Sequence, residues 1–378
     1  LHKAIRRQRQ MCIRDRYVGV PVALRFARCF DVVGYDMDAR RIEKLREKYG
    51  AGCGSIRFTS LEEELSRAAF YIVTVLTPVD ERKNPDLTCL VEATRTVARY
   101  LKRGDYVVYE STVYPGCTEE VCVPLLEKGS GLKLGADFKV GYSPERINPN
   151  DSEHTFSNTA KIVSANDGQA LDEVARVYAE VVAADLCRAS GIRVAEAAKM
   201  TENVQRSVNI ALMNELQRLF SRMGIDMGEV IDMASSKWNF VKYRPGLGGG
   251  HCIPVDPRYL VSAASKLGVE MPVTSSGCAV NDGMAAYVVR SLLGAMGSDG
   301  RGARALLMGV TYKENIDDIR NSRIAEMVGL LEREGMSVDV TDPHADPDKV
   351  YAMYGIRPVP ALRPPYDLIV VAVAHDEY

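Results

Sequence analysis

Short apolar runs alternate with amphipathic helical stretches along most of this chain, and this alternation is the feature that most constrains its fold. The runs have the length of strands and are separated by segments with helical periodicity, such as 39–48 and 87–101. This order is typical of β-α-β units, which build parallel sheets. The predicted strands form two blocks, 31–35, 69–76, 106–109, 138–142 and 160–164 in the first and 305–310, 337–341 and 366–374 in the second.

A single long helix is predicted between the two blocks. Apolar positions recur at helical spacing over 192–223, and no glycine or proline occurs between Arg193 and Met223. The predicted α/β fold therefore has two parallel-sheet domains joined by a long central helix and a helical domain. The chain stops at Tyr378, directly after a core-type strand that a helix normally covers, so we expect the natural protein to continue. The predicted division is an atypical basic segment at 1–16 followed by domains at 17–190, 191–297 and 298–378.

Composition narrows the class of partner. A net charge of -2 gives no electrostatic reason to bind nucleic acid or a membrane surface. The apolar runs at 69–76 and 368–374 are too short to span a bilayer. The 9 cysteines are scattered, odd in number and free of any C-x-x-C pair, which argues against a disulfide framework or a zinc site. We therefore predict a cytoplasmic protein in a reducing compartment, with no nucleic-acid, membrane or metal partner.

The first β-α turn departs from the usual nucleotide-binding pattern. That turn normally carries G-x-G-x-x-G, and an acidic residue about 20 positions later binds the ribose. Here only Gly19 remains, because Arg14 and Arg16 occupy the first two glycine positions. Asp36 ends the next strand and disfavours the 2′-phosphate of NADP, although Arg41 nearby blunts that preference. Alternatively, Gly19 only packs a helix and Asp36 is a surface residue.

Residues 1–16 carry six basic side chains against one acidic side chain, and no hydrophobic strand is evident in them. We therefore expect this segment to be foreign to the fold and to pack poorly, which would leave the sheet incomplete. We also expect the arginines at the glycine positions to crowd the path of a pyrophosphate, so that NAD binds weakly.

The segment 243–257 places one cysteine on a loop with four glycines, beside a histidine and an aspartate. The glycines allow close approach of the backbone to a ligand, and Pro254 and Pro257 stiffen the chain after the cysteine. A thiol with a pKa of ~8.5 is mostly protonated at neutral pH, so Cys252 would need an adjacent base or cation to act as a nucleophile. The alternative is a Gly/Pro turn that holds a buried cysteine.

Several short motifs occur in one order along the chain: Tyr17 to Pro21, Glu110 to Val113, Ser143 to Arg146, Lys199 with Asn203, and Gly249 to Asp256. With these motifs the chain resembles the UDP-glucose/GDP-mannose dehydrogenase family. Lys237 to Phe240, Arg244 to Gly246 and the pair His251 and Cys252 look most like the UDP-N-acetylhexosamine 6-dehydrogenases of surface-polysaccharide synthesis. The resemblance implies an N-terminal NAD-binding Rossmann domain, a central helical domain that forms a homodimer, and a C-terminal Rossmann-like domain that binds UDP.

The chemistry implied by the resemblance is a four-electron oxidation of the sugar C6 hydroxyl to a carboxylate, with two NAD reduced. Cys252 would hold C6 as a thiohemiacetal and then as a thioester. Lys199 and Asn203 are four residues apart, so they share a helix face that Arg206 continues, and they can stabilise an oxyanion. Glu145 and Asp256 would handle protons and water, and either carboxylate can be the base.

The resemblance also implies contacts with the cofactor and the substrate. Thr112 and Glu110 end a predicted strand, where a nicotinamide would lie. Trp238, the only tryptophan, lines the sugar pocket or anchors its loop. The predicted cofactor-binding residues are Gly19, Asp36, Arg41, Thr77, Thr112 and Arg320, and the predicted substrate-binding residues are Arg146, Arg206, Tyr243, Arg244, Gly249, His251 and Lys313.

Three functions compete on the sequence alone. The first is the UDP-N-acetylhexosamine 6-dehydrogenase, and the second is a UDP-glucose or GDP-mannose 6-dehydrogenase that uses the same chemistry. The third is a truncated, inactive fragment that binds a UDP-sugar without turnover. The number of NADH molecules formed per sugar separates the enzymes from the fragment.

Overall fold

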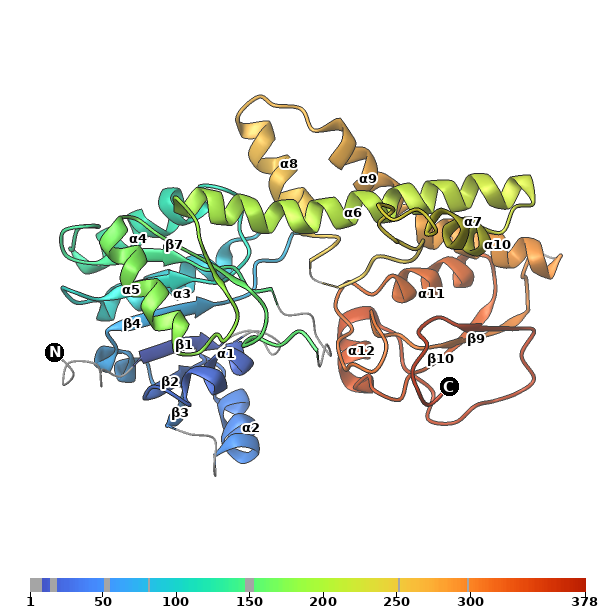
Figure 1. Cartoon of the computed structure of the whole chain (residues 1–378). Coiled ribbons are helices and arrows are strands. Elements are labelled where there is room, and N and C mark those ends of the chain that lie inside the picture. The colour runs from blue at the N-terminus through green and yellow to red at the C-terminus, as the bar shows by residue number, and fades with distance from the viewer. Residues whose placement is uncertain are drawn as a thin grey trace. The chain divides into compact units, whose positions relative to one another are not determined.

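The computed structural model describes residues 9–13, 19–50, 55–80, 82–146, 153–250, 252–297 and 299–378. The chain divides into two compact units, Leu1–Thr201 and Glu202–Tyr378 (Figure 1). The boundary between the units falls within one helix, α6 (Ile192–Met223), whose bounds agree with the helix predicted from the sequence. Within the part of the chain that the structure describes, no helix combines the length and the apolar character needed to cross a bilayer.

The first unit contains one sheet with the strand order β3-β2-β1-β4-β5-β6-β7-β8. Neighbouring strands run parallel except β6 and β7, which are antiparallel. Five of these strands follow the predicted apolar runs, whereas β1, β3 and β8 were not predicted. The strands are β1 (Arg9–Ile13), β2 (Val32–Tyr35), β3 (Ile56–Thr59), β4 (Phe70–Thr74), β5 (Tyr106–Tyr109), β6 (Lys139–Tyr142), β7 (Lys161–Ala165) and β8 (Leu186–Arg188).

Strand β1 corrects one expectation. Residues 9–13 pair with both β2 and β4 in the interior of the sheet, so the prediction that the whole segment 1–16 is foreign to the fold is wrong. The charge count over sixteen residues obscured the short apolar run Met11-Cys12-Ile13, which is enough for a strand between two strands that are themselves buried. Arg14 and Arg16 lie outside the described residues.

Helices with one apolar face cover this sheet because their apolar positions recur at helical spacing. Phe26 of α1 and Tyr178 of α5 pack edge to face with their ring centroids 5.5 Å apart, and both belong to the main core. Aspartates at the N-caps, Asp38 and Asp167, begin two of the helices. The helical segments of this unit are α1 (Gly19–Phe26), α2 (Ala39–Tyr49), η2 (Glu62–Arg67), α3 (Thr88–Tyr100), η3 (Thr118–Cys122), α4 (Val123–Ser130) and α5 (Gly168–Ala179).

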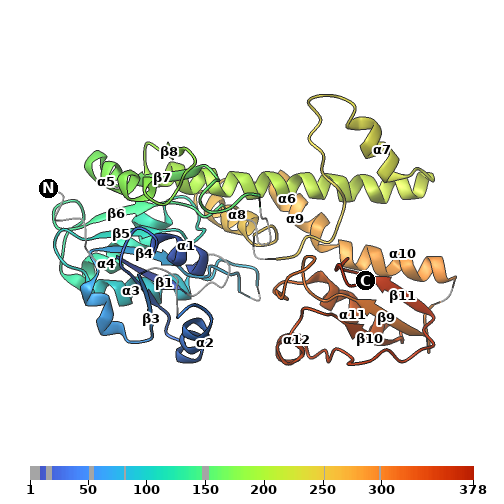
Figure 2. The same cartoon turned by 60° about the horizontal axis from the view of Figure 1, so that its bottom comes forward.

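The second unit combines helices with a parallel three-stranded sheet of order β10-β9-β11. Figure 2 shows α11 and α12 beside this sheet, and a core that includes Leu307, Val328 and Val350 fills the space between them. The α/β fold with two parallel-sheet regions is thereby confirmed. The elements are α7 (Met227–Ala234), α8 (Asp256–Lys266), α9 (Pro272–Asp282), α10 (Met284–Met296), β9 (Arg304–Met308), α11 (Arg323–Arg333), β10 (Ser337–Thr341), α12 (Pro347–Tyr354) and β11 (Leu368–Val371).

Candidate active site

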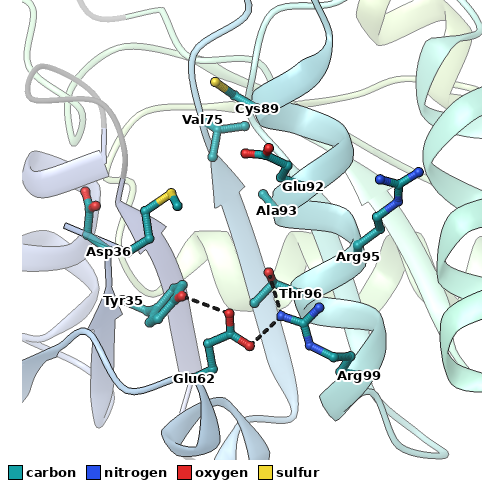
Figure 3. Close-up of a pocket in the computed structure, with 11 residues that line it drawn as sticks. Tyr35, Asp36, Glu62, Val75, Cys89, Glu92, Ala93, Arg95, Thr96 and Arg99 are labelled. Atoms are coloured by element: carbon teal, nitrogen blue, oxygen red, sulfur yellow. Dashed lines mark hydrogen bonds and ion pairs between the residues drawn. The ribbon is translucent and has the colours of Figure 1, made fainter. Parts of the chain in front are cut away.

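A pocket of about 260 Å³ opens in the first unit between the end of β2 and helix α3 (Figure 3). Glu62 lines this pocket, and its carboxylate accepts hydrogen bonds from the Tyr35 hydroxyl at 3.4 Å and from Arg99. This place, beyond the carboxyl ends of parallel strands, is where doubly wound sheets bind nucleotides. The lining residues are Tyr35, Asp36, Met37, Glu62, Val75, Cys89, Glu92, Ala93, Arg95, Thr96 and Arg99.

Asp36 lies at this pocket with its carboxylate almost fully buried. It accepts a hydrogen bond from the backbone of Asp38 at 2.9 Å and forms an ion pair with Arg41 at 3.0 Å. A carboxylate at the end of the second strand suits the hydroxyls of a ribose, so these residues fit the adenosine half of NAD. Two of the predicted cofactor-binding residues, Asp36 and Arg41, therefore lie together beside a pocket.

Two further predicted cofactor-binding residues meet on neighbouring loops. The Thr77 hydroxyl, after β4, donates to the carbonyl oxygen of Thr112, after β5, at 2.7 Å. Gly19 is buried at the start of α1. These positions follow the strand ends at which an α/β sheet binds its ligand.

Glu145, which follows β6, belongs to a buried charged cluster in the same unit. Its carboxylate accepts hydrogen bonds from Lys161 at 3.0 Å and from the backbone of Arg146 at 2.7 Å. Lys161 also contacts Glu110 at 3.2 Å, and the Glu110 side chain has no exposed surface. The expectation that Glu110 offers itself to a nicotinamide is therefore wrong, because its side chain faces the interior. The guanidinium of Arg146 donates to the carbonyl oxygen of Ala160 at 3.2 Å.

Sequence reasoning missed Lys161, although a signal was present. It is the first residue of a strand in which every residue is buried. A lysine inside a buried strand needs a partner of opposite charge, since burial of an unpaired ammonium is costly. That requirement points to the glutamates at the ends of the neighbouring strands.

Helix α6 carries Lys199 and Asn203, one turn apart on the same face. Lys199 is 8% exposed, and in the part of the chain that the structure describes its side chain has no hydrogen-bond or ion-pair partner. Asn203 is buried and donates to the carboxylate of Asp256, at the start of α8. Arg206, which continues this face, is exposed. An ammonium that is buried without a partner is a typical feature of a functional site.

Glu196, one turn before Lys199, ties α6 to the loop after β5. Its buried carboxylate accepts backbone hydrogen bonds from Gly116 at 2.6 Å and from Thr118 at 3.0 Å. Burial raises the pKa of Glu196 to about 7, while the bonds from Thr118 and Gly116 oppose the shift. Sequence reasoning did not identify this residue. The contact fixes the part of α6 that presents Lys199 against the segment that contains Thr112.

The glycine-rich loop of the second unit is fastened to α6 by Asn214. The Asn214 amide accepts a hydrogen bond from the Gly246 N–H at 2.8 Å and donates to the Gly246 carbonyl oxygen at 3.1 Å. Asn281 of α9 accepts a further hydrogen bond from Asn214 at 2.9 Å. Both asparagines are buried, so the loop enters its turn at a fixed position. Neither asparagine was predicted from the sequence.

Cys252 is exposed at the end of this loop. Its carbonyl oxygen accepts hydrogen bonds from the backbone of Val255 at 3.3 Å and of Asp256 at 3.0 Å, so a tight turn leads directly from the thiol into α8. The alternative of a buried cysteine in an ordinary turn is excluded by this exposure. The predicted substrate residue His251 lies outside the described residues.

The glycines before Cys252 are required by the side chains packed behind them. A Cβ on Gly249 would meet the Tyr312 Cβ at 2.9 Å, and one on Gly250 would meet the Tyr312 ring at 2.8 Å. Gly250 also has a φ of +82°, which other residues rarely adopt. The amide of Asn321 donates to the Gly250 carbonyl oxygen at 3.1 Å. The loop thus lies flat against Tyr312 and Asn321.

We expect Gly250→Ala to lower the free energy of unfolding by about 1–3 kcal/mol, because a strained φ and a clash with Tyr312 are combined. Activity should fall at least tenfold, since the displaced backbone carries Cys252 with it. Gly246→Ala is the matched control, because a Cβ there meets nothing within 4 Å and φ is not positive. Chemical denaturation and NADH assays measure both effects. Equal losses in the two variants would contradict this explanation.

The remaining predicted substrate residues belong to the second unit. Tyr243 packs on the side chains of Met213 and Met227, and the exposed Arg244 lies 3.7 Å from Asp232. The predicted substrate residue Lys313 and the predicted cofactor residue Arg320 lie between β9 and α11. The exposed Trp238 precedes the glycine loop.

Arg320 forms an ion pair with the carboxylate of Asp318 at 2.7 Å. A cofactor phosphate would therefore compete with the Asp318 carboxylate for the Arg320 guanidinium. A guanidinium can bind an anion while it keeps one carboxylate, since it has several donors. The assignment stays a prediction.

The carboxyl edge of the second sheet holds polar residues that sequence reasoning missed. Asp342, after β10, accepts hydrogen bonds from the backbone of Val310 at 2.6 Å and of Thr311 at 3.1 Å. His375, after β11, lies 3.2 Å from the same carboxylate. The loop after β9 is therefore held by hydrogen bonds to the Asp342 carboxylate. The signal was an aspartate directly after the second strand, as in the first unit.

Comparison with known proteins decides the family. Residues 9–182 match the NAD binding domain of the UDP-glucose/GDP-mannose dehydrogenase family, residues 193–283 its central domain and residues 306–378 its UDP binding domain. The chain belongs to this family. It is accordingly an NAD-dependent oxidoreductase of nucleotide sugars, as the resemblance of its motifs implied. The predicted cofactor, NAD, is confirmed.

The most informative relatives of this dehydrogenase span almost its whole length. UDP-N-acetyl-D-glucosamine 6-dehydrogenase of Pseudomonas aeruginosa is 46% identical over 96% of this chain and 89% of the relative. The protein of the same name from Salmonella typhi is 44% identical over 96% of this chain and 88% of the relative. A solved UDP-D-ManNAc dehydrogenase of Pyrococcus horikoshii has a TM-score of 0.86 at 29% identity and covers 98% of this chain and 90% of its own.

Proposed function

We propose that this dehydrogenase oxidises the C6 hydroxyl of a UDP-N-acetylhexosamine, with UDP-N-acetylglucosamine as its best substrate, to the uronic acid. The observation that carries the choice of sugar is the difference in identity among relatives. Two proteins named for UDP-N-acetyl-D-glucosamine are 44–46% identical to this chain, whereas one named for UDP-N-acetyl-D-mannosamine is 31% identical. A nucleotide-activated uronic acid is a building block for acidic surface polysaccharides, which is the role we infer for the product.

The residues suit an oxidation in two stages. NAD held beside Asp36 and Arg41 would supply the hydride acceptor for both stages, and the first oxidation of C6 would give an aldehyde. The Cys252 thiolate adds to the aldehyde carbon to give a thiohemiacetal, and loss of the second hydride leaves a thioester. Water then breaks the C–S bond, which releases the carboxylate and returns the thiol. In all, one alcohol, one water and two NAD give one carboxylate, two NADH and three protons.

Lys199 is buried and has no partner among the described residues, which supports its role as the charge that stabilises oxygen at C6. Asn203 keeps an amide proton for the same oxygen while its other donor is held by Asp256. We therefore assign Asp256 to the orientation of Asn203, and Glu145 to the removal of protons from substrate and water. Cys252 is exposed, as attack on a sugar requires.

Stoichiometry across four substrates tests this function. UDP-N-acetylglucosamine, UDP-N-acetylgalactosamine, UDP-glucose and GDP-mannose are each supplied in limiting amount with excess NAD. We expect two NADH per UDP-N-acetylglucosamine and the highest kcat/KM with that sugar. One NADH per sugar would indicate a simple alcohol dehydrogenase. Tight nucleotide-sugar binding without NADH would indicate a binding fragment.

We also propose a homodimer that forms along α6. Three apolar side chains of its second half, Leu212, Leu219 and Met223, are 48–59% exposed and recur at spacings of seven and four residues. An exposed apolar stripe on a helix favours association with another helix. Sedimentation velocity should therefore show a dimer for the wild type and a monomer for the double variant Leu212→Asp with Leu219→Asp. A wild-type monomer at micromolar concentration would contradict this proposal.

We also propose that the reaction takes place in the reducing cytoplasm, because a reactive thiol and NAD are both suited to that compartment.

A further inference from the structure

Lys161 lies between two carboxylates in the interior of the first unit. Its ammonium nitrogen is 3.2 Å from Oε2 of Glu110 and 3.0 Å from Oε2 of Glu145, and it lies 3.4 Å from the carbonyl oxygen of Pro144. The exposed fractions of the three charged side chains are 3%, 0% and 9%. An ammonium has three protons, so this geometry uses all of them.

The other oxygens of the two carboxylates also have donors. The Tyr178 hydroxyl donates to Oε1 of Glu110, and the backbone N–H of Arg146 donates to Oε1 of Glu145 at 2.7 Å. The rings of Phe156 and Tyr178 flank the ammonium, with centroids 4.6 Å and 5.5 Å from its nitrogen. Every polar atom is held, so the orientation of Glu145 depends on the whole cluster.

The cluster has one positive group for two negative ones. Burial raises the pKa of Glu110 to about 7, while the charge of Lys161 lowers it and that of Glu145 raises it. Burial alone would lower the pKa of Lys161, but the two carboxylates outweigh burial and raise it. The ammonium therefore stays charged, and the cluster gains or loses its proton near neutral pH at Glu110.

We propose that Lys161 and Glu110 are positioning residues for Glu145: Lys161 fixes the Glu145 carboxylate, and Glu110 determines how much of the Lys161 charge Glu145 receives. This inference rests on the role proposed above for Glu145 as a base. When Glu110 is protonated, Glu145 is the only charged carboxylate that the Lys161 ammonium contacts. When Glu110 ionises, the same ammonium is shared between two charged carboxylates, so its attraction for Glu145 is weaker.

The groups that face Glu110 come from each neighbouring element. They are Lys161 from β7, Glu145 from the segment after β6, and Tyr178 from α5. Tyr178 is buried and its pKa is raised well above its ordinary value, first by burial and then by the charge of Glu110, so it stays a neutral donor. Tyr178 therefore does not ionise near neutral pH, whereas the pKa of Glu110 lies in that range.

The decisive experiment is the pH profile of kcat for Glu110→Gln beside the wild type. The wild type should show a rise in kcat near pH 7, and this rise should be absent from Glu110→Gln, which should keep the kcat of the low-pH form. Lys161→Met should lower kcat and move the rise upward by about one to three pH units, because the opposite charge is lost. Glu127→Gln and Lys139→Met are the matched controls, since both side chains lie on other elements, and their profiles should match the wild type.

An infrared titration of the buried carboxyl group supplies a readout that does not need turnover. The absorption of protonated carboxyl groups that is lost near pH 7 in the wild type should be smaller by one group in Glu110→Gln, because Glu196, whose pKa is also raised to about 7, keeps its own contribution. If the wild type turns over and Glu110→Gln has the same pH profile as the wild type, the inference is overturned. If the wild type forms no NADH, the proposed function fails, and the infrared band alone then tests whether Glu110 titrates. Should Lys161→Met not fold, Glu110→Gln alone decides.

Discussion

Cys252→Ser is expected to stop the reaction after the first hydride transfer, so that at most one NADH forms per sugar and steady-state kcat falls at least about a thousandfold. A serine hydroxyl has almost no alkoxide at neutral pH, whereas a thiol is readily activated, so the aldehyde is no longer captured. Binding of NAD should be unchanged, because the pocket beside Asp36 is formed by the first unit alone.

The measurement combines NADH counting in a single turnover with trapping of the aldehyde by hydroxylamine. Mass spectrometry of the acid-quenched wild type should also find the sugar attached to the peptide that contains Cys252. Cys187→Ser is the matched control, since Cys187 is likewise an exposed cysteine but lies on β8. Formation of the second NADH at the wild-type rate in Cys252→Ser would exclude the thioester route.

Lys199→Met is expected to lower kcat by about 10²–10³-fold, the usual effect of removing one oxyanion-stabilising group. The same substitution should raise the free energy of unfolding, by about 1 kcal/mol, because it removes a buried ammonium that has no partner among the described residues. The two effects have opposite signs, which is typical of residues kept for activity at a cost in stability.

Steady-state kinetics and chemical denaturation measure the two effects separately. Lys44→Met serves as the control, because Lys44 is an exposed lysine of α2, and both quantities should stay close to wild type. A Lys199→Met protein that is less stable and fully active would show that Lys199 has a structural role. Lys199→Arg should restore part of kcat, since the positive charge is kept while its shape changes.

The sequence predicted the elements whose pattern is long and periodic. The bounds of α6 were predicted correctly, because thirty-two residues without glycine or proline leave little choice. Strand β1 was missed, since five residues surrounded by arginines give too short an apolar signal. Asn214 was missed for another reason. A mid-helix asparagine has no local pattern, and its partner Gly246 is 32 residues away.

The residues of the candidate site also fall into those that the sequence predicted and those that it did not. Motifs made of adjacent residues, such as the glycine loop before Cys252, could be recognised from the sequence. Residues that act by charge across the sheet could not, because Lys161 and Glu110 are 51 positions apart and only the order of the strands brings them together. Burial reversed the expectation for Glu110, since a sequence shows that a carboxylate ends a strand but not which way it faces.

The antiparallel direction of β7 determines which of its residues lies near Glu145. In the register of β6 and β7, Gly141 is opposite Ala165 and Tyr142 opposite Ser164, so Lys161, three residues before Ser164, comes level with Glu145, three residues after Tyr142. A parallel strand would bring its last residue to that edge and its first residue to the far side of the sheet. The reversed direction of β7, which β8 shares, thus brings a cation to Glu145. Related sheets in which this strand runs parallel would have to supply the cation from a different part of the chain.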